Sequence, residues 1–180
     1  MTPPESRVTT EILWQAALIF GLVDILFVFI LTTRMDRELF RQLRSVLMVT
    51  TGVLWCLIWA LMSLFFWEPV YHYLFPAWAR WLIPPIYGCL FGGVARLFWW
   101  LSFRIPGRPL LNFFLLGGMW GTVTHIWGIS RGLLEKPPML QGTSPIAATI
   151  MPFFEFVFYW CIILTMAMLL YRARVRRSAV

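Results

Sequence analysis

The chain has 180 residues, of which 60% are hydrophobic and 13% charged; its mean hydropathy is +0.75 and its net charge +7. A soluble domain is about half apolar and a quarter charged, so this composition excludes an ordinary soluble protein. The positive charges stand beside apolar stretches rather than forming a basic domain, which argues against a nucleic-acid partner.

Five apolar stretches are each long enough to cross a bilayer, because a core about 30 Å thick requires roughly 20 helical residues. In chain order they cover residues 11–32, 43–66, 79–102, 109–133 and 145–171. Backbone polar groups in lipid must be satisfied within the segment, which favours helices. The sequence therefore predicts an all-α, multi-pass protein of the cell membrane. We expect a bundle of five transmembrane helices that forms a single membrane domain over residues 1–180.

The first stretch is expected to be a retained helix, because residues 1–11 lack the basic cluster of a signal peptide and no small-residue cleavage site follows. The basic residues then indicate the orientation through the positive-inside rule. With the N-terminus outside, four basic residues fall on the outer side: Arg7, Arg80, Arg131 and Lys136. Ten fall on the inner side: Arg34, Arg37, Arg41, Arg44, Arg104, Arg108, Arg172, Arg174, Arg176 and Arg177. We therefore expect an outer N-terminus and a cytoplasmic C-terminus.

Two features interrupt the apolar pattern. Residues 66–80 are rich in aromatic residues and proline, which predicts a short interfacial segment on the outer surface. Pro84 and Pro85 fall inside the expected third helix and Pro152 inside the fifth. Proline removes an intrahelical hydrogen bond, so we expect both helices to bend there.

Small residues recur at helical spacing on two of the expected helices. The third carries Gly88 and Gly92, followed four residues later by Arg96, and the fourth carries Gly117, Gly121 and Gly128. Rows of small residues allow another surface to approach the backbone closely. We expect this surface to be a neighbouring helix; the alternative is the flat face of a ring.

His125 follows Gly121 by four residues, a spacing that leaves room for a macrocycle above the histidine ring. Imidazole can ligate haem iron, so His125 and Gly121 form a candidate cofactor site for a tetrapyrrole. The alternative is a histidine that bonds between two helices.

Four ionisable residues lie within the expected spans, and such residues are costly in lipid. Topology places Asp24 roughly 20 Å and Arg96 roughly 25 Å below the outer edge, with Glu155 at roughly 15 Å and His125 at roughly 9 Å. Depth therefore predicts two intramembrane pairs, Arg96 with Asp24 and His125 with Glu155. The pairs would fix helix register or form a ligand or proton site in the outer half.

No catalytic motif is present, so an enzyme is not favoured. Glu68 and His72 are four residues apart, but the three or four convergent ligands of a zinc site are not visible. The three cysteines fall inside spans and form no CxxC pair.

The function expected first is that of an accessory, structural subunit of a larger membrane complex. Its partners would be the bilayer and other membrane subunits, contacted through glycine-lined and aromatic helix faces. The first alternative is a pigment or haem carrier with His125 as axial ligand. The second is a small-molecule transporter or sensor that uses Glu155 and His125 in an outer-half site.

Overall fold

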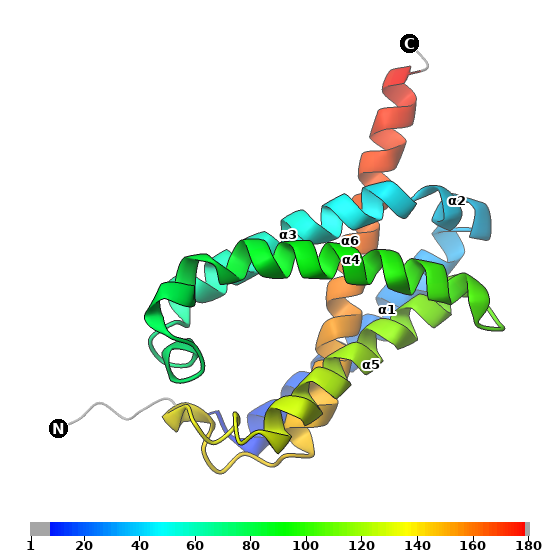
Figure 1. Cartoon of the computed structure of the whole chain (residues 1–180). Helices are drawn as coiled ribbons and strands as arrows, with labels where there is room; N and C mark the ends of the chain where they lie inside the picture. Colours follow the sequence, from blue (N-terminus) through cyan, green and yellow to red (C-terminus); the bar gives the residue numbers. More distant parts are fainter. Residues whose placement is uncertain (1–7, 179–180) are drawn as a thin grey trace.

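The computed structural model describes residues 8–178, and within them the chain is all-helical, as the sequence predicts. Six α-helices are joined by turns and by three short 3₁₀ helices (Figure 1). The α-helices are α1 (Thr10–Arg34), α2 (Arg37–Gln42), α3 (Arg44–Phe65), α4 (Ile83–Arg104), α5 (Pro109–Ser130) and α6 (Ala147–Ser178). The 3₁₀ helices are η1 (Tyr71–Tyr73), η2 (Ala77–Trp81) and η3 (Pro138–Leu140).

Among the described residues, four helices are long and apolar enough to cross a membrane: α1, α3, α4 and α6. This finding supports a membrane-embedded protein. Helix α5 has 22 residues but is not among these four, because Asn112 and His125 lower its mean hydropathy. The fifth crossing, like the orientation of the termini, stays a prediction.

Polar side chains cap the N-terminal starts of the first two helices. The Thr9 side chain accepts a hydrogen bond from the backbone N–H of Ile12 and caps α1. After α1 ends, Asp36 caps α2 by accepting from the N–H of Leu39 at 2.7 Å. Such caps satisfy backbone donors at a helix start. The arginine-rich connection between the first two expected spans, residues 33–42, therefore contains a short helix.

Two of the three prolines lie at a helix start rather than inside the helix that they were expected to bend. Helix α4 begins at Ile83 rather than at residue 79, so Pro84 and Pro85 lie in its first turn. Proline is accommodated there because the first backbone N–H groups of a helix have no partner to lose. These two prolines set the start of α4, whereas Pro152 lies inside α6.

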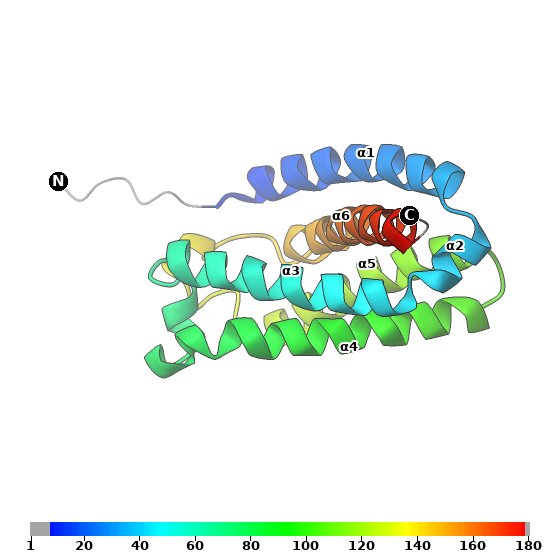
Figure 2. The same ribbon diagram turned by 90° about the horizontal axis from the view of Figure 1, so that it is seen from above.

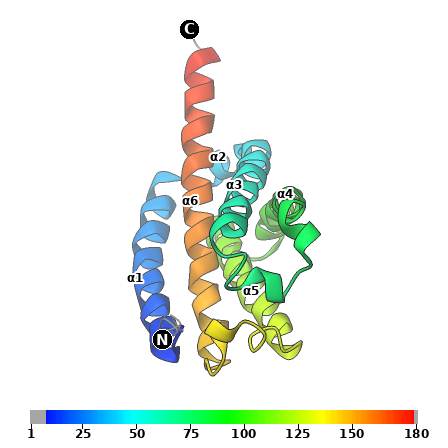
Figure 3. The same cartoon turned by 90° about the vertical axis from the view of Figure 1, so that its left-hand side faces the viewer.

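Helix α6 lies at the centre of the bundle and packs against α1, α5 and α3 (Figures 1 and 2). Helices α3 and α4 form a close antiparallel hairpin on one side of it (Figure 3). Helix α5 leaves the turn after α4 beside this hairpin and then diverges from it (Figure 1). In the turn, Gly107 has a φ of 113°, a backbone conformation that favours glycine.

The C-terminal part of α6 extends well past the other helices (Figure 1). A helix of 32 residues is about 48 Å long, which exceeds a hydrocarbon core of about 30 Å. Its last residues, 172–178, are all exposed and include four arginines. The helix therefore continues beyond residue 171, where the expected fifth span ended.

Candidate functional site

The glycines on α5 lie against α6. A Cβ added to Gly117 would be 2.1 Å from Cδ1 of Trp160, and one added to Gly121 would be 2.6 Å from the carbonyl oxygen of Pro152. Neither position has room for a side chain. By contrast, Gly128 faces no helix so closely, since the nearest atom to its Cβ would be 3.7 Å away in Leu133.

This packing leaves no room for the expected macrocycle. The space above Gly121 is filled by Pro152 and by the ring of Phe156, whose Cγ would lie 2.7 Å from a Gly121 Cβ. His125 is exposed, and its Nδ1 lies 2.8 Å from the carbonyl oxygen of Gly121. The residues around His125 therefore do not fit a tetrapyrrole above Gly121.

The two polar pairs expected from depth are not brought together. Asp24 is buried on α1 against α6, near the Cys161 thiol, and neither of its carboxylate oxygens has a hydrogen-bond partner among the described residues. Arg96 is exposed on α4. Similar depth does not place two side chains on facing sides of their helices: one of these is buried and the other exposed, and they form no ion pair.

Glu155 has a different partner from the one expected. Its carboxylate accepts a hydrogen bond from the hydroxyl of Tyr159, one turn later on α6, rather than from His125. Both residues are half-buried. Burying a carboxylate in a membrane costs free energy, and a hydrogen-bond donor stabilises it. Because this donor is on the same helix, the bond does not depend on how α6 packs against the other helices.

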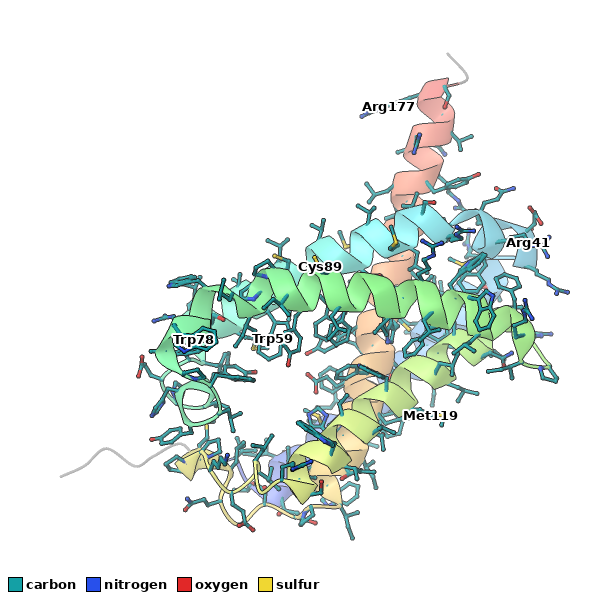
Figure 4. All side chains as sticks on the ribbon, viewed as in Figure 1. Arg41, Trp59, Trp78, Cys89, Met119 and Arg177 are labelled. Atoms are coloured by element: carbon teal, nitrogen blue, oxygen red, sulfur yellow. The ribbon has the colours of Figure 1, made fainter. Side chains whose placement is uncertain are left out.

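Seven aromatic residues pack against one another in the angle between the α3–α4 hairpin and α6, and one of them, Tyr159, holds this carboxylate. We call this set, together with Glu155, the aromatic wedge. Its aromatic members are Trp55 and Trp59 of α3, Tyr71 of η1, Tyr87 and Phe91 of α4, and Phe156 and Tyr159 of α6. Figure 4 shows Trp59 on the side of the hairpin that faces α5 and α6.

The rings of the aromatic wedge contact one another in an unbroken series. Trp55 stacks on Phe91 with centroids 3.9 Å apart and meets the edge of Tyr159 at 5.4 Å. The ring centroid of Trp59 lies 4.2 Å from that of Tyr87 and 5.2 Å from that of Tyr71. The series therefore runs from α6 through the hairpin to the segment that connects α3 with α4.

Two hydrogen-bond donors of the wedge lack an acceptor. The indole N–H groups of Trp55 and Trp59 are buried, and no acceptor among the described residues reaches either of them. Trp55 is only 4% exposed. Buried donors are nearly always paired in proteins. The indole N–H groups of Trp120 and Trp160 are also buried without an acceptor among the described residues, so the two in the wedge stand out only because their ring series leads to Tyr159 and Glu155.

Tyr71 brings the connecting segment into this site. It lies outside the long helices, and its ring closes the wedge over Trp59. Burial raises the pKa of Tyr71 to about 12, with smaller contributions from the negative charge of Glu155 and from Tyr87. Tyr71 is therefore a neutral hydroxyl at physiological pH.

The remaining candidates, Glu68 and His72, do not form a metal site. Glu68 and His72 are both exposed, and His72 packs on the ring of Tyr73 with centroids 3.6 Å apart. Within residues 8–178, no three His, Cys, Asp or Glu side chains are grouped to hold a metal ion.

Sequence reasoning singled out Glu155 but missed the aromatic residues around it. The spacing of Glu155 and Tyr159, four residues apart on a helix, was a signal for their hydrogen bond. The positions of Trp59, Tyr71 and Tyr87 carried no such signal, since they meet only through the packing of the hairpin.

The chain was also compared with known proteins. No family model, curated protein or solved structure matches it.

Proposed function

We propose that this protein binds a small amphipathic molecule in the aromatic wedge beside Glu155, and that it acts as a membrane sensor or transporter for that molecule. One observation carries the proposal: a half-buried carboxylate accepts a hydrogen bond from a member of the aromatic wedge, in which two buried indole N–H groups have no acceptor in the described chain. An ionisable residue at membrane depth is a functional candidate by default.

The chemistry of the wedge favours a particular kind of molecule. Aromatic faces attract cations, and a carboxylate adds a full negative charge and hydrogen-bond acceptors. The free N–H groups of Trp55 and Trp59 would donate to an acceptor on the same molecule. The ligand we propose therefore has an apolar body, a cationic or N–H-bearing end for Glu155, and an oxygen or nitrogen acceptor nearby.

We also propose that all five long helices cross the cell membrane as a single domain, with the N-terminus outside. The arginines at the ends of α1, α4 and α6 and in α2 support this orientation. Arg7, part of the outer group, lies outside the described residues. In this orientation, the η1 side of the wedge is on the outer side.

The orientation is tested by labelling single cysteines in intact cells after Cys56, Cys89 and Cys161 have been replaced by serine. A membrane-impermeant reagent is expected to label Glu135→Cys in the α5–α6 connection and not Ser178→Cys. Labelling of Ser178→Cys and not of Glu135→Cys would show the opposite orientation, with the C-terminus outside.

The binding proposal is tested with the purified chain in nanodiscs. Tryptophan fluorescence and thermal stability would be measured against a panel of organic cations and their uncharged isosteres. We expect saturable binding of at least one cation, weakened about tenfold or more by Glu155→Gln. Glu135→Gln, in the exposed α5–α6 connection, is the matched control and should bind like wild type.

Two results would contradict the proposal. One is equal binding by wild type and Glu155→Gln, and the other is no saturable binding by any member of the panel. The accessory-subunit role expected from the sequence would then gain weight, and stable co-purification with a large assembly from the native membrane would support it.

A further inference from the structure

We propose that the arginine-rich end of the α3–α4 hairpin holds the phosphate group of an anionic phospholipid. The site is a hollow of about 370 Å³, which we call the arginine pocket. It is lined by Arg44, Gly93, Arg96, Leu97, Trp99 and Trp100. This site is distinct from the aromatic wedge and does not depend on the function proposed for it.

The register of the hairpin brings two arginines together. A Cβ on Gly88 would lie 2.7 Å from the carbonyl oxygen of Gly52, and one on Gly92 would lie 3.2 Å from that of Met48. Four residues forward on α4 therefore correspond to four residues back on α3. The next step places Arg96 beside Arg44, and the close glycine contact keeps the two helices near each other at this point.

Neither arginine has an acidic partner in the part of the chain that the structure describes. The ion pair found there joins Arg41 to Glu38 at 3.6 Å. Two neighbouring positive charges repel each other, and an unpaired arginine near lipid is costly. An anion held between Arg44 and Arg96 would remove both costs.

The walls of the pocket prepare it for such an anion. The Arg44 guanidinium lies over the ring of Trp99, 5.7 Å from its centroid, and the indole N–H of Trp99 donates to the carbonyl oxygen of Phe40 at 3.0 Å. The Trp99 ring is thereby fixed. No atom lies within 4 Å of the position a Gly93 Cβ would occupy, so the pocket stays open there.

The surroundings identify the source of the phosphate as the membrane. Arg96 lies eight residues before Arg104, or roughly 12 Å along α4 from its arginine-rich end. The apolar side chains of Leu97 and Trp100 line the same pocket and are about half exposed, at 49% and 47%. A phospholipid can place its phosphate on the guanidinium groups, which bind phosphate through paired N–H donors, and its apolar part on Leu97.

The experiment measures lipid binding by the full chain in mild detergent, using native mass spectrometry and thermal stability. Phosphatidylglycerol, phosphatidylcholine and inorganic phosphate would be added separately. We expect phosphatidylglycerol to bind saturably and raise the Tm, while phosphatidylcholine and inorganic phosphate at equal concentration do not. Arg96→Gln and Arg44→Gln should each weaken this binding about tenfold.

Arg174→Gln is the matched control, because Arg174 is also an exposed arginine, on the projecting end of α6. We expect it to bind phosphatidylglycerol like wild type. Equal weakening by Arg174→Gln and Arg96→Gln would overturn the site in favour of diffuse charge attraction. Stabilisation by inorganic phosphate alone, equal to that by the lipid, would overturn the lipid as ligand. Arg96→Lys keeps the positive charge but removes the paired N–H donors, and it serves as a second variant in case Arg96→Gln does not fold. A folded lysine variant that binds phosphatidylglycerol as tightly as wild type would overturn the paired-donor geometry.

Discussion

The hydroxyl of Tyr159 donates a hydrogen bond to the carboxylate of Glu155 on the same face of α6. The ring of Tyr159 also packs edge-on against Trp55 of α3, with centroids 5.4 Å apart. A single side chain therefore joins the intramembrane carboxylate to the α3–α4 hairpin. Hydrogen bonds to charged acceptors are stronger than those between neutral groups, and this bond lies in a region of low dielectric.

Tyr159→Phe keeps the ring and removes only this hydrogen bond. We expect the free energy of unfolding to fall by about 1.5–3 kcal/mol, because the Glu155 carboxylate loses its donor while it stays half-buried. Chemical denaturation in mixed micelles measures the change. Tyr73→Phe, at an exposed tyrosine in η1, should leave stability within about 0.5 kcal/mol of wild type. An equal fall in the free energy of unfolding for both variants would show that the hydrogen bond to Glu155 does not stabilise the fold.

Gly117→Ala tests the packing of α5 on α6. The added Cβ would lie 2.1 Å from Cδ1 of Trp160, a side chain that is fully buried. We expect a loss of about 1–3 kcal/mol, because the large ring has no free space into which it can move. Gly93→Ala is the control, since nothing lies within 4 Å of its Cβ position, and its stability should be unchanged or slightly higher. Thermal unfolding of the two variants gives the comparison, and equal Tm values would contradict the packing described here.

Asp24→Asn tests the buried carboxylate of α1. Asp24 is 5% exposed and its oxygens have no partner among the described residues, so its charge lowers the stability of the fold. Removing that charge should leave the free energy of unfolding unchanged or raise it by about 1–3 kcal/mol. Denaturation at neutral pH checks the direction. A clear loss of stability would mean that Asp24 has a stabilising partner in the membrane.

Tyr71→Phe tests the closure of the wedge through its pH dependence. Burial raises the pKa of Tyr71 to about 12, whereas in the unfolded chain it ionises near pH 10. The unfolded chain therefore loses this proton first, and the free energy of unfolding falls as the pH rises from about 10 to about 12. This contribution is fully present below pH 10 and amounts to about 2–3 kcal/mol.

The phenylalanine variant cannot lose this proton, so it should lose less stability than wild type over the same pH interval. Denaturation at pH values on both sides of the interval measures the difference, and tyrosinate absorbance follows the ionisation itself. Parallel pH profiles for Tyr71→Phe and wild type would show that Tyr71 is not buried in the folded protein.

The helices could be predicted from the sequence because hydropathy and length constrain a membrane segment strongly. The all-helical class is confirmed, and four helices have the length and apolarity to cross a membrane. The start of α4 was placed too early, at residue 79, because η2 (Ala77–Trp81) is helical and leads directly into α4 at Ile83. The expected spans left residues 33–42 as a connection, and the N-cap signal of Asp36, which starts α2 there, was not used.

The site could be predicted only in part, because sequence gives the depth of a side chain better than its direction. Glu155 was singled out as an intramembrane carboxylate, and the structure places it in the aromatic wedge. Arg96 and Asp24 were paired by depth alone, yet one faces outward on α4 and the other faces α6. The rotation of each helix is decided by packing contacts such as Gly88 on Gly52, which involve residues far apart in the chain.

The docking of α1 on α6 has a consequence for how the chain is made. Helix α1 leaves the ribosome first, but the helix it packs against begins only at Ala147. At about 5–20 residues per second, α1 waits roughly 5–25 s before its partner is synthesised. During that interval Asp24 has no helix to cover it, and the hydrogen bond from the Ser144 N–H to Thr10 is not yet available. Burial of Asp24 is therefore a late step of membrane insertion, which a nascent chain ending before α6 cannot complete.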